Sequence, residues 1–211
     1  MEITKHLSLI NFTQGINKEN KYIVVHYTGN NGDSAINNAI YFHSDNRGAS
    51  AHYFVDEDDI VQVVLDENIG WHCGTTGTYK HFECRNANSI GIEMCSRIDG
   101  YGKYYIKDEV IEKTQELIRY LMKLHNIPLE NVIRHYDVTG KICPAPMVTD
   151  EELWEDFMSN IEKNTEQDLS SWAEDGYKYV LENEISDGLN PKDNVTREEL
   201  WTMLERFSKK I

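Results

Sequence analysis

Short apolar runs recur along the chain up to about residue 135 and predict a buried sheet. The run at 22–25 leads into His26, and the run at 132–133 leads almost directly into His135. Uninterrupted apolar runs are typical of strands that are covered on both faces. The pattern therefore predicts that two histidines arrive at strand ends on one edge of the same sheet.

Other apolar runs extend this sheet. The run at 89–95 contains a single carboxylate, Glu93, and predicts a further strand. Two more runs, at 51–56 and 60–65, flank the acidic turn at 56–59 and predict a hairpin.

Two helices are predicted among these strands. The clearer one spans 107–126, where apolar residues recur at steps of three and four, and Pro128 is expected to end it. A shorter helix is predicted over 34–44, with Ser34 or Asp33 as its N-cap. Its inward face is expected to consist of Ile36, Ala39, Ile40 and His43.

The rest of the chain reads as helical. Thr149 and Glu152 form the pattern of a capping box that opens a helix. Polar residues then predict a linker at 163–168. Beyond it we expect two amphipathic helices, the second capped by Thr196 and facing the first through Leu200, Met203, Leu204 and Phe207.

These patterns predict an α/β fold with a mixed central sheet flanked by helices. We expect a catalytic domain over 1–162, a linker over 163–168 and a small α-helical domain over 169–211. A chain of 211 residues that is 40% hydrophobic suits one core of ordinary size and a small appendage.

Charge and leader signals narrow the function classes. The net charge of −15 argues against a nucleic-acid partner, because such binding depends on Lys and Arg contacts to phosphate. The first residues lack a basic segment followed by an apolar one, and no run approaches the ~18 apolar residues of a membrane span. We therefore expect a chain that folds in the cytoplasm, with no membrane partner.

The four cysteines fit that compartment because their spacing is irregular. Cys143 is interpreted as a metal ligand and Cys95 as part of a strand. Cys73 and Cys84 are interpreted as free thiols, with a disulfide between them as the less favoured alternative.

The loop at 134–144 carries the most informative chemistry, because it combines His135, Lys141 and Cys143. Together with His26 it offers two imidazoles and one thiol. This donor set suits zinc and leaves a fourth tetrahedral position for water, which is the arrangement of a catalytic site.

Five segments in a fixed order carry a family resemblance. They are Ile23-Val24-Val25-His26-Tyr27-Thr28, Ala51-His52-Tyr53-Phe54-Val55, Gly70-Trp71-His72-Cys73-Gly74, Asn88-Ser89-Ile90-Gly91-Ile92-Glu93 and the segment from His135 to Pro144. Through these segments the chain resembles the zinc-dependent N-acetylmuramoyl-L-alanine amidases of the type 2 family, which include phage endolysins and are related to peptidoglycan recognition proteins. The segments occur in the family's order, and the resemblance covers roughly residues 20 to 162.

The resemblance implies one Zn²⁺ held by His26, His135 and Cys143, and hydrolysis of the amide that joins N-acetylmuramic acid to L-alanine of the stem peptide. Glu93 is then expected to act as general base and later as acid, although an outward-facing, solvated Glu93 remains the alternative. Lys141 is expected to stabilise the oxyanion. Some family members have a Tyr where this chain has Ala51, which places more of the work on Glu93.

Two further histidines are assigned weaker roles. His72 is expected to line the groove and contact the substrate. His52 is expected to pack in the sheet near the metal, without touching it.

The C-terminal segment resembles a single S-layer homology motif, from 171 to 200. The resemblance implies binding to peptidoglycan or a secondary wall polymer. Because one helical hairpin buries little apolar area, we expect it either to dock on the first domain or to self-associate. A passive hairpin that only covers the catalytic domain is the alternative. Together the two resemblances imply a phage or prophage endolysin that is made in the host cytoplasm, reaches the wall after release and causes lysis.

Two alternatives from other classes stay open. One is a recognition module that binds peptidoglycan without cutting it. The other is a cysteine peptidase that uses Cys143 as nucleophile and His135 as base.

Overall fold

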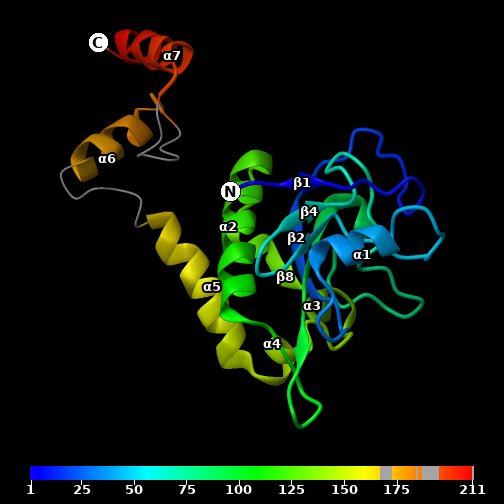
Figure 1. Ribbon diagram of the computed structural model, residues 1–211. Coiled ribbons are helices and arrows are strands. Elements are labelled where there is room, and N and C mark those ends of the chain that lie inside the picture. Colours follow the sequence, from blue (N-terminus) through cyan, green and yellow to red (C-terminus); the bar gives the residue numbers. More distant parts are fainter. Residues whose placement is uncertain (167–172, 184, 187–194, 211) are drawn as a thin grey trace. The chain divides into compact units, whose positions relative to one another are not determined.

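The computed structural model describes residues 1–166, 173–183, 185–186 and 195–210. Two compact units divide the chain, Met1–Ile161 and Glu162–Ile211. Figure 1 shows the elements of each unit along the sequence. All the residues with predicted site chemistry lie in the first unit.

A six-stranded mixed sheet forms the centre of the first unit, in the order β1-β4-β3-β5-β2-β8. Its strands are β1 (Thr4–Lys5), β2 (Tyr22–Tyr27), β3 (Tyr53–Val55), β4 (Ile60–Gln62), β5 (Ser89–Met94) and β8 (Val132–Arg134). The strand β2 is parallel to both β5 and β8, whereas β3 and β4 form the predicted antiparallel hairpin. The predicted mixed α/β fold is therefore confirmed.

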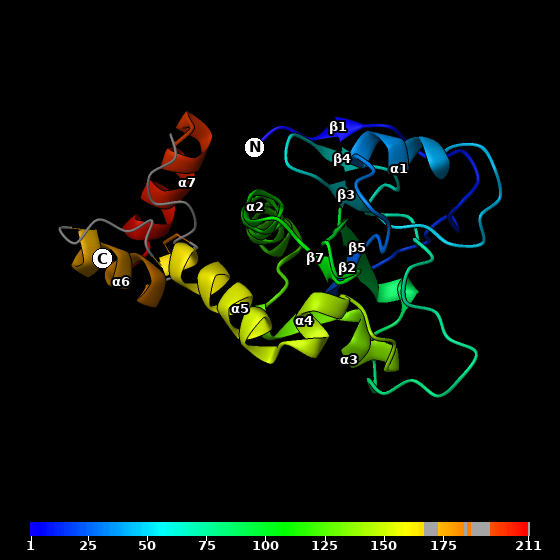
Figure 2. The ribbon, with the colours of Figure 1, turned by 60° about the horizontal axis from the view of Figure 1, so that its bottom comes forward.

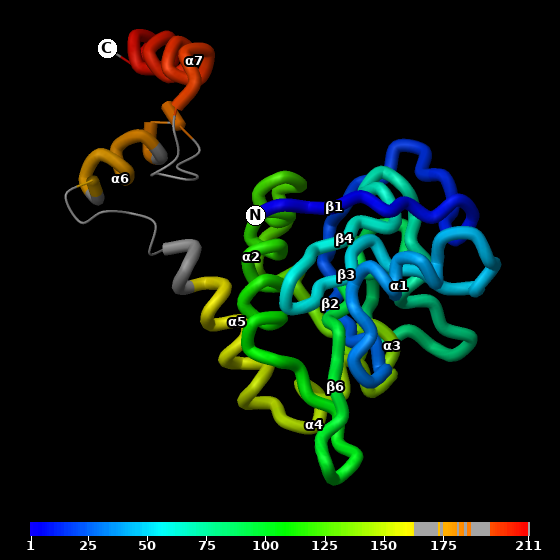
Figure 3. Tube along the Cα trace, in the orientation of Figure 1, coloured from blue at the N-terminus to red at the C-terminus, as the bar shows by residue number. Residues whose placement is uncertain are grey.

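A second, two-stranded sheet pairs β6 (Arg97–Ile98) with β7 (Tyr104–Tyr105). In Figure 3 it is the green loop that extends beyond the β6 label. Short helical elements fill the remaining connections. They are the 3-10 helices η1 (Asn86–Asn88) and η2 (Leu129–Asn131) and the α-helices α3 (His135–Thr139) and α4 (Ala145–Thr149).

Helices cover both faces of the main sheet (Figure 2). On one face α2 (Asp108–His125) and α5 (Glu151–Glu166) pack over β2 and β5, where Ile23 and Val25 point into the main core. On the other face α1 (Ala35–Tyr41) packs against β3 and β4. Val24 lies on that second face in a smaller cluster with Cys73 and Cys84. Cover on both faces explains the uninterrupted apolar runs.

The helix ends follow local capping chemistry. The Ser34 hydroxyl accepts a hydrogen bond from the Asn37 N–H, which confirms Ser34 as the cap of α1. The predicted inward face of α1 is only partly right: Ala39 is buried and Ile36 packs against the apolar cluster, but the other buried residues are Ala35 and Asn38. Ile40 is 57% exposed. The face was misjudged because the helix is covered through small and polar side chains.

The predicted span of α2 is confirmed to within one residue at each end, but Asn126 rather than Pro128 ends the helix. Asn126 adopts a left-handed conformation with φ of 52°, and its N–H caps the carbonyls of Met122 and Lys123. The helix therefore ends before Pro128, through an αL cap.

The predicted capping box at Thr149 is wrong. The Thr149 hydroxyl donates to the Ala145 carbonyl at 2.9 Å, so this residue closes α4. The following helix, α5, continues to Glu166 through much of the predicted linker.

The second unit contains α6 (Glu174–Glu182) and α7 (Arg197–Ser208). Thr196 and Glu199 form the predicted capping box of α7. Phe207 contacts Tyr179 of α6, but Leu204 is 56% exposed, so only part of the predicted face of α7 is covered. Parts of the S-layer-like segment, at 167–172 and 187–194, lie outside the described residues. No helix in the described part of the chain is both long and apolar enough to cross a membrane.

Candidate metal centre and active site

Three parallel strands deliver polar side chains to one edge of the sheet. The register pairs His26 of β2 with Glu93 of β5. On the other side of β2, Val25 pairs with Arg134, the last residue of β8, so His135 follows at the level of His26. Carboxyl ends of parallel strands meet at one edge, where ligand sites commonly form.

His26, His135 and Cys143 converge at this edge. The Nδ1 atoms of the two imidazoles lie 3.1 Å apart, and Cys143 Sγ lies 3.7 Å from His26 Nδ1. One donor atom from each side chain falls within 4.8 Å of the other two, and all three residues are buried. The sequence had predicted this group, and the fold brings it together from positions 117 residues apart.

The loop after α3 places the thiol. The Tyr136 N–H donates to the Cys143 carbonyl at 2.9 Å, which folds the loop back over the start of α3. Arg134 holds the same segment, because its guanidinium donates to both carboxylate oxygens of Asp137 and to the Met147 carbonyl. These bonds fix Cys143 relative to the end of β8.

The ionisation of these groups suits a soft divalent cation. Burial lowers the pKa of His26 well below its usual value and that of His135 to about 4, so both rings are neutral and carry a free lone pair at neutral pH. Burial raises the pKa of the Cys143 thiol to about 12, so a nearby positive charge is needed to stabilise its thiolate.

The spacing also fits zinc. With Zn–N bonds of ~2.0 Å and Zn–S bonds of ~2.3 Å, tetrahedral coordination separates two nitrogens by roughly 3.3 Å and nitrogen from sulfur by roughly 3.5 Å. The distances of 3.1 Å and 3.7 Å agree with those values. The donor set and its geometry therefore fit a single zinc ion.

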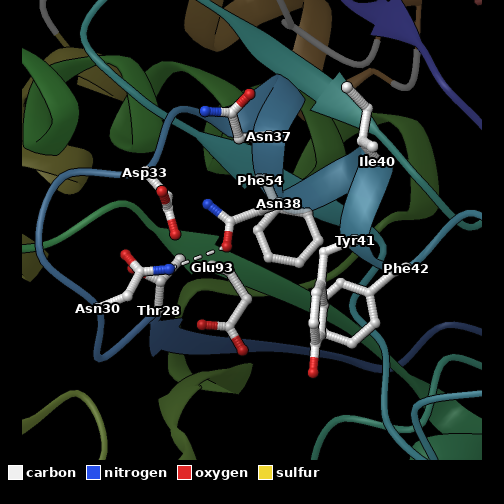
Figure 4. Close-up of a pocket in the computed structure, with 10 residues that line it drawn as sticks. All are labelled: Thr28, Asn30, Asp33, Asn37, Asn38, Ile40, Tyr41, Phe42, Phe54 and Glu93. Carbon is white, nitrogen blue, oxygen red and sulfur yellow. Dashed lines mark hydrogen bonds between the residues drawn. The ribbon is translucent and has the colours of Figure 1, made fainter.

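Glu93, which pairs with His26 in the register of the sheet, lines an open cavity of about 530 Å³ (Figure 4). The other walls come from the loop after β2, from α1 and from β3, and they mix amides with aromatic rings. The Oε2 atom of Glu93 is buried and has no hydrogen-bond partner in the described part of the chain. Burial raises the pKa of Glu93 to about 8, an effect that the nearby Lys141 ammonium opposes. Glu93 as a whole is half-buried at this open cavity, so a solvated Glu93 remains the alternative.

Lys141 lies on the exposed surface of the loop that carries Cys143. Its positive charge lowers the pKa of Glu93, and also contributes to the lowered pKa of both His26 and His135. The Lys141 ammonium is therefore close enough to affect the charge of Glu93 and of both candidate histidine ligands.

His72 lies elsewhere than the sequence suggested. We expected it along the groove, but its ring is only 8% exposed and lies behind His26, with its Nδ1 atom 3.1 Å from His26 Nε2. The ring occupies the space above Gly91 on β5, where a Cβ atom would come within 2.5 Å of it. A glycine inside a strand often marks such a close approach, and this signal was present in the sequence.

Lys18 lies behind His72 and holds the surrounding backbone through hydrogen bonds. Sequence reasoning did not identify this residue. Its ammonium donates to the carbonyls of Asp66, Asn68 and Ser89 at 2.8–3.1 Å and lies 3.1 Å from His52 Nε2. Burial lowers the pKa of Lys18 to about 8. As expected, His52 is buried near the centre without belonging to the donor group.

Comparison with known proteins places this site in a family. Residues 17–146 match the family model described as N-acetylmuramoyl-L-alanine amidase. The chain belongs to this amidase family. Cys143 and both candidate histidine ligands lie inside the matched segment.

Individual amidases agree with this assignment. The chain is 35% identical to the N-acetylmuramoyl-L-alanine amidase CwlL of Bacillus licheniformis over 150 residues, which are 67% of this chain and 41% of CwlL. It thus spans about two fifths of the length of the curated relatives it matches first.

Solved structures match the amidase fold over a larger share of the chain. PlyL aligns with a TM-score of 0.64 at 29% identity, covering 76% of this chain and 97% of PlyL. A mutant endolysin from Bacillus subtilis aligns with a TM-score of 0.61 at 30% identity, covering 76% and 99%.

The half-buried Lys18 gives a test of the hydrogen-bonded network behind His72. Lys18→Met leaves three carbonyls without their donor, so we expect a loss of about 3–5 kcal/mol in the free energy of unfolding, measured by urea denaturation. Lys21→Met is the matched control: it removes a solvent-exposed ion pair with Glu83, and we expect a change of less than about 1 kcal/mol. Equal losses in the two variants would contradict the assigned role of Lys18.

Proposed function

We propose that this chain is a zinc-dependent N-acetylmuramoyl-L-alanine amidase that cuts the bond between the lactyl group of N-acetylmuramic acid and L-alanine of the stem peptide. The observation that carries the proposal is the convergence of His26, His135 and Cys143 at the sheet edge where Glu93 pairs with His26, within the fold of this family. His26, His135 and Cys143 are the proposed zinc ligands.

Zinc bound there would polarise the scissile carbonyl and lower the pKa of a water molecule. Glu93 is the proposed group that takes the proton from the attacking water and returns it to the leaving amine. A carboxyl whose pKa is raised to about 8 suits both steps, because it gains and loses a proton near neutral pH.

Lys141 is the proposed stabiliser of the charge that develops on the carbonyl oxygen. Its exposure leaves the ammonium free to meet a substrate in the cavity, and its charge already acts on Glu93. The same cavity offers amide and aromatic side chains to the stem peptide and its sugar.

The alternatives fit the site less well. A cysteine peptidase needs a reactive thiolate, but burial raises the pKa of Cys143 to about 12. A recognition module without activity gives no reason for three metal donors at the strand edge where Glu93 keeps a buried oxygen without a hydrogen-bond partner in the described part of the chain.

For the rest of the chain we propose the role expected from its sequence. The segment 169–211 would bind peptidoglycan or a secondary wall polymer, with self-association through exposed apolar residues of α7 such as Trp201, which is 62% exposed. The chain would then act as an endolysin on the bacterial wall, released from the cytoplasm of its host.

The role of Glu93 can be tested by Glu93→Gln, which replaces the ionisable carboxyl group by a neutral amide of nearly the same shape. We expect the rate of stem-peptide release from purified walls to fall by about 10²–10⁴-fold. Mass spectrometry of the released products measures this rate. Glu83→Gln makes the same change at an exposed position on the first unit and is expected to keep full activity. Release by Glu93→Gln at the wild-type rate would remove Glu93 from the reaction.

The metal assignment predicts one zinc per chain by elemental analysis. Cys143→Ala removes one of three protein ligands, so we expect it to lose the metal and the activity, whereas Cys95→Ala, in the apolar cluster under α1, is expected to retain both. Chelation of the wild type should abolish release, and added zinc should restore it. A chelated protein that still cuts walls would speak for a metal-free mechanism.

A further inference from the structure

A line of buried hydrogen bonds runs from the back of the candidate metal centre into the protein. His26 Nε2 lies 3.1 Å from His72 Nδ1, and His72 Nε2 lies 3.2 Å from Ser89 Oγ. Ser89 Oγ in turn lies 2.7 Å from the carbonyl oxygen of Arg85. His26, His72 and Ser89 are all buried.

The last member of this line sets the direction of every bond in it. A main-chain carbonyl can only accept, so the Ser89 hydroxyl donates its one proton to Arg85. Ser89 Oγ must then accept from His72, which places the single proton of a neutral His72 ring on Nε2. His72 Nδ1 is left as an acceptor for a proton on His26 Nε2.

We propose that His72 and Ser89 are positioning residues that hold the proton of His26 on Nε2 and thereby keep His26 Nδ1 free to bind the metal. This inference rests on the proposed metal site. His26 Nδ1 is the atom that faces His135 and Cys143, so the tautomer that the line selects is the one that zinc needs. Partners of this kind orient metal-binding histidines and raise their basicity.

The backbone around His72 is built to admit its ring. A Cβ atom on Gly91 would lie 2.5 Å from His72 Cγ, so only glycine leaves room for the imidazole against β5. The backbone N–H of His72 is held by the side-chain oxygen of Asn86 at 3.1 Å. Gly91 on one side and the Asn86 side chain on the other thus hold the His72 ring next to His26.

The first test reads the tautomer directly in metal-free protein. Two-bond ¹H–¹⁵N spectra of the ¹⁵N-labelled wild type should show His26 with a protonated Nε2 and a bare Nδ1. In Ser89→Ala, His72 loses the acceptor for its Nε2 proton, and we expect His26 to populate the other tautomer as well. A wild-type His26 that carries its proton on Nδ1 would overturn the proposal.

The second test measures zinc affinity by competition with a chromophoric chelator. We expect about 10–100-fold weaker binding in His72→Phe and in Ser89→Ala. Ser96→Ala is the matched control, since Ser96 is also buried but donates to the Asn30 carbonyl, away from His72, and it should bind zinc like the wild type. Thermal melting identifies any variant that fails to fold. If His72→Phe does not fold, the zinc affinity of Ser89→Ala alone tests the proposal.

The outcomes separate this inference from the proposed function. Wild-type affinity in both variants, or an equal loss in Ser96→Ala, would overturn the positioning role. A wild type that binds no zinc would refute the proposed function, and the tautomer of His26 in the metal-free protein would still decide the inference.

Discussion

The parallel pairing of β2 with β5 and β8 is the constraint on which the site depends. Its register sets His26 beside Glu93 and brings His135 to the same level. Side chains alternate between the faces of a strand, so a slip of one residue would turn His26 toward α2 and into the main core. Apolar cover on both faces prevents such a slip, because it would also carry Val25 out of that core. The packing of the sheet and the geometry of the donors therefore have the same cause.

Burial has opposite consequences for the groups at this edge. It keeps the His26 and His135 rings neutral, which leaves their lone pairs available. The same burial disfavours the thiolate of Cys143 and the carboxylate of Glu93. A local positive charge reconciles these effects, and Lys141 supplies part of it in a chain whose net charge is −15. A divalent cation would supply the rest, which is why binding of metal and deprotonation of the thiol are coupled.

Sequence reasoning captured features that periodicity and residue type record. Apolar runs located the strands β2, β5 and β8, and the donor types located the candidate ligands. The errors have physical reasons. Thr149 has the spacing of a cap, but its hydroxyl closes the preceding helix, since caps and helix ends use the same residue types. His72 was placed in the groove because its depth depends on the close approach of its ring to Gly91, and the glycine in the strand was not interpreted as the mark of such an approach.

The polar residues behind the site bear on orientation more than on stability. Lys18, His52, His72 and Ser89 are largely buried, yet each finds partners among buried carbonyls or rings. Removing one member alone leaves its partners without a hydrogen bond and is destabilising. Replacing such a polar network as a whole by well-packed apolar side chains often costs little, so stability alone gives no reason for four polar residues here. Apolar side chains could fill the same space, but they could not choose which nitrogen of His26 carries a proton. The proposed role of these residues, to support His26 as a metal ligand through hydrogen bonds, explains why polar side chains stand where apolar ones could pack.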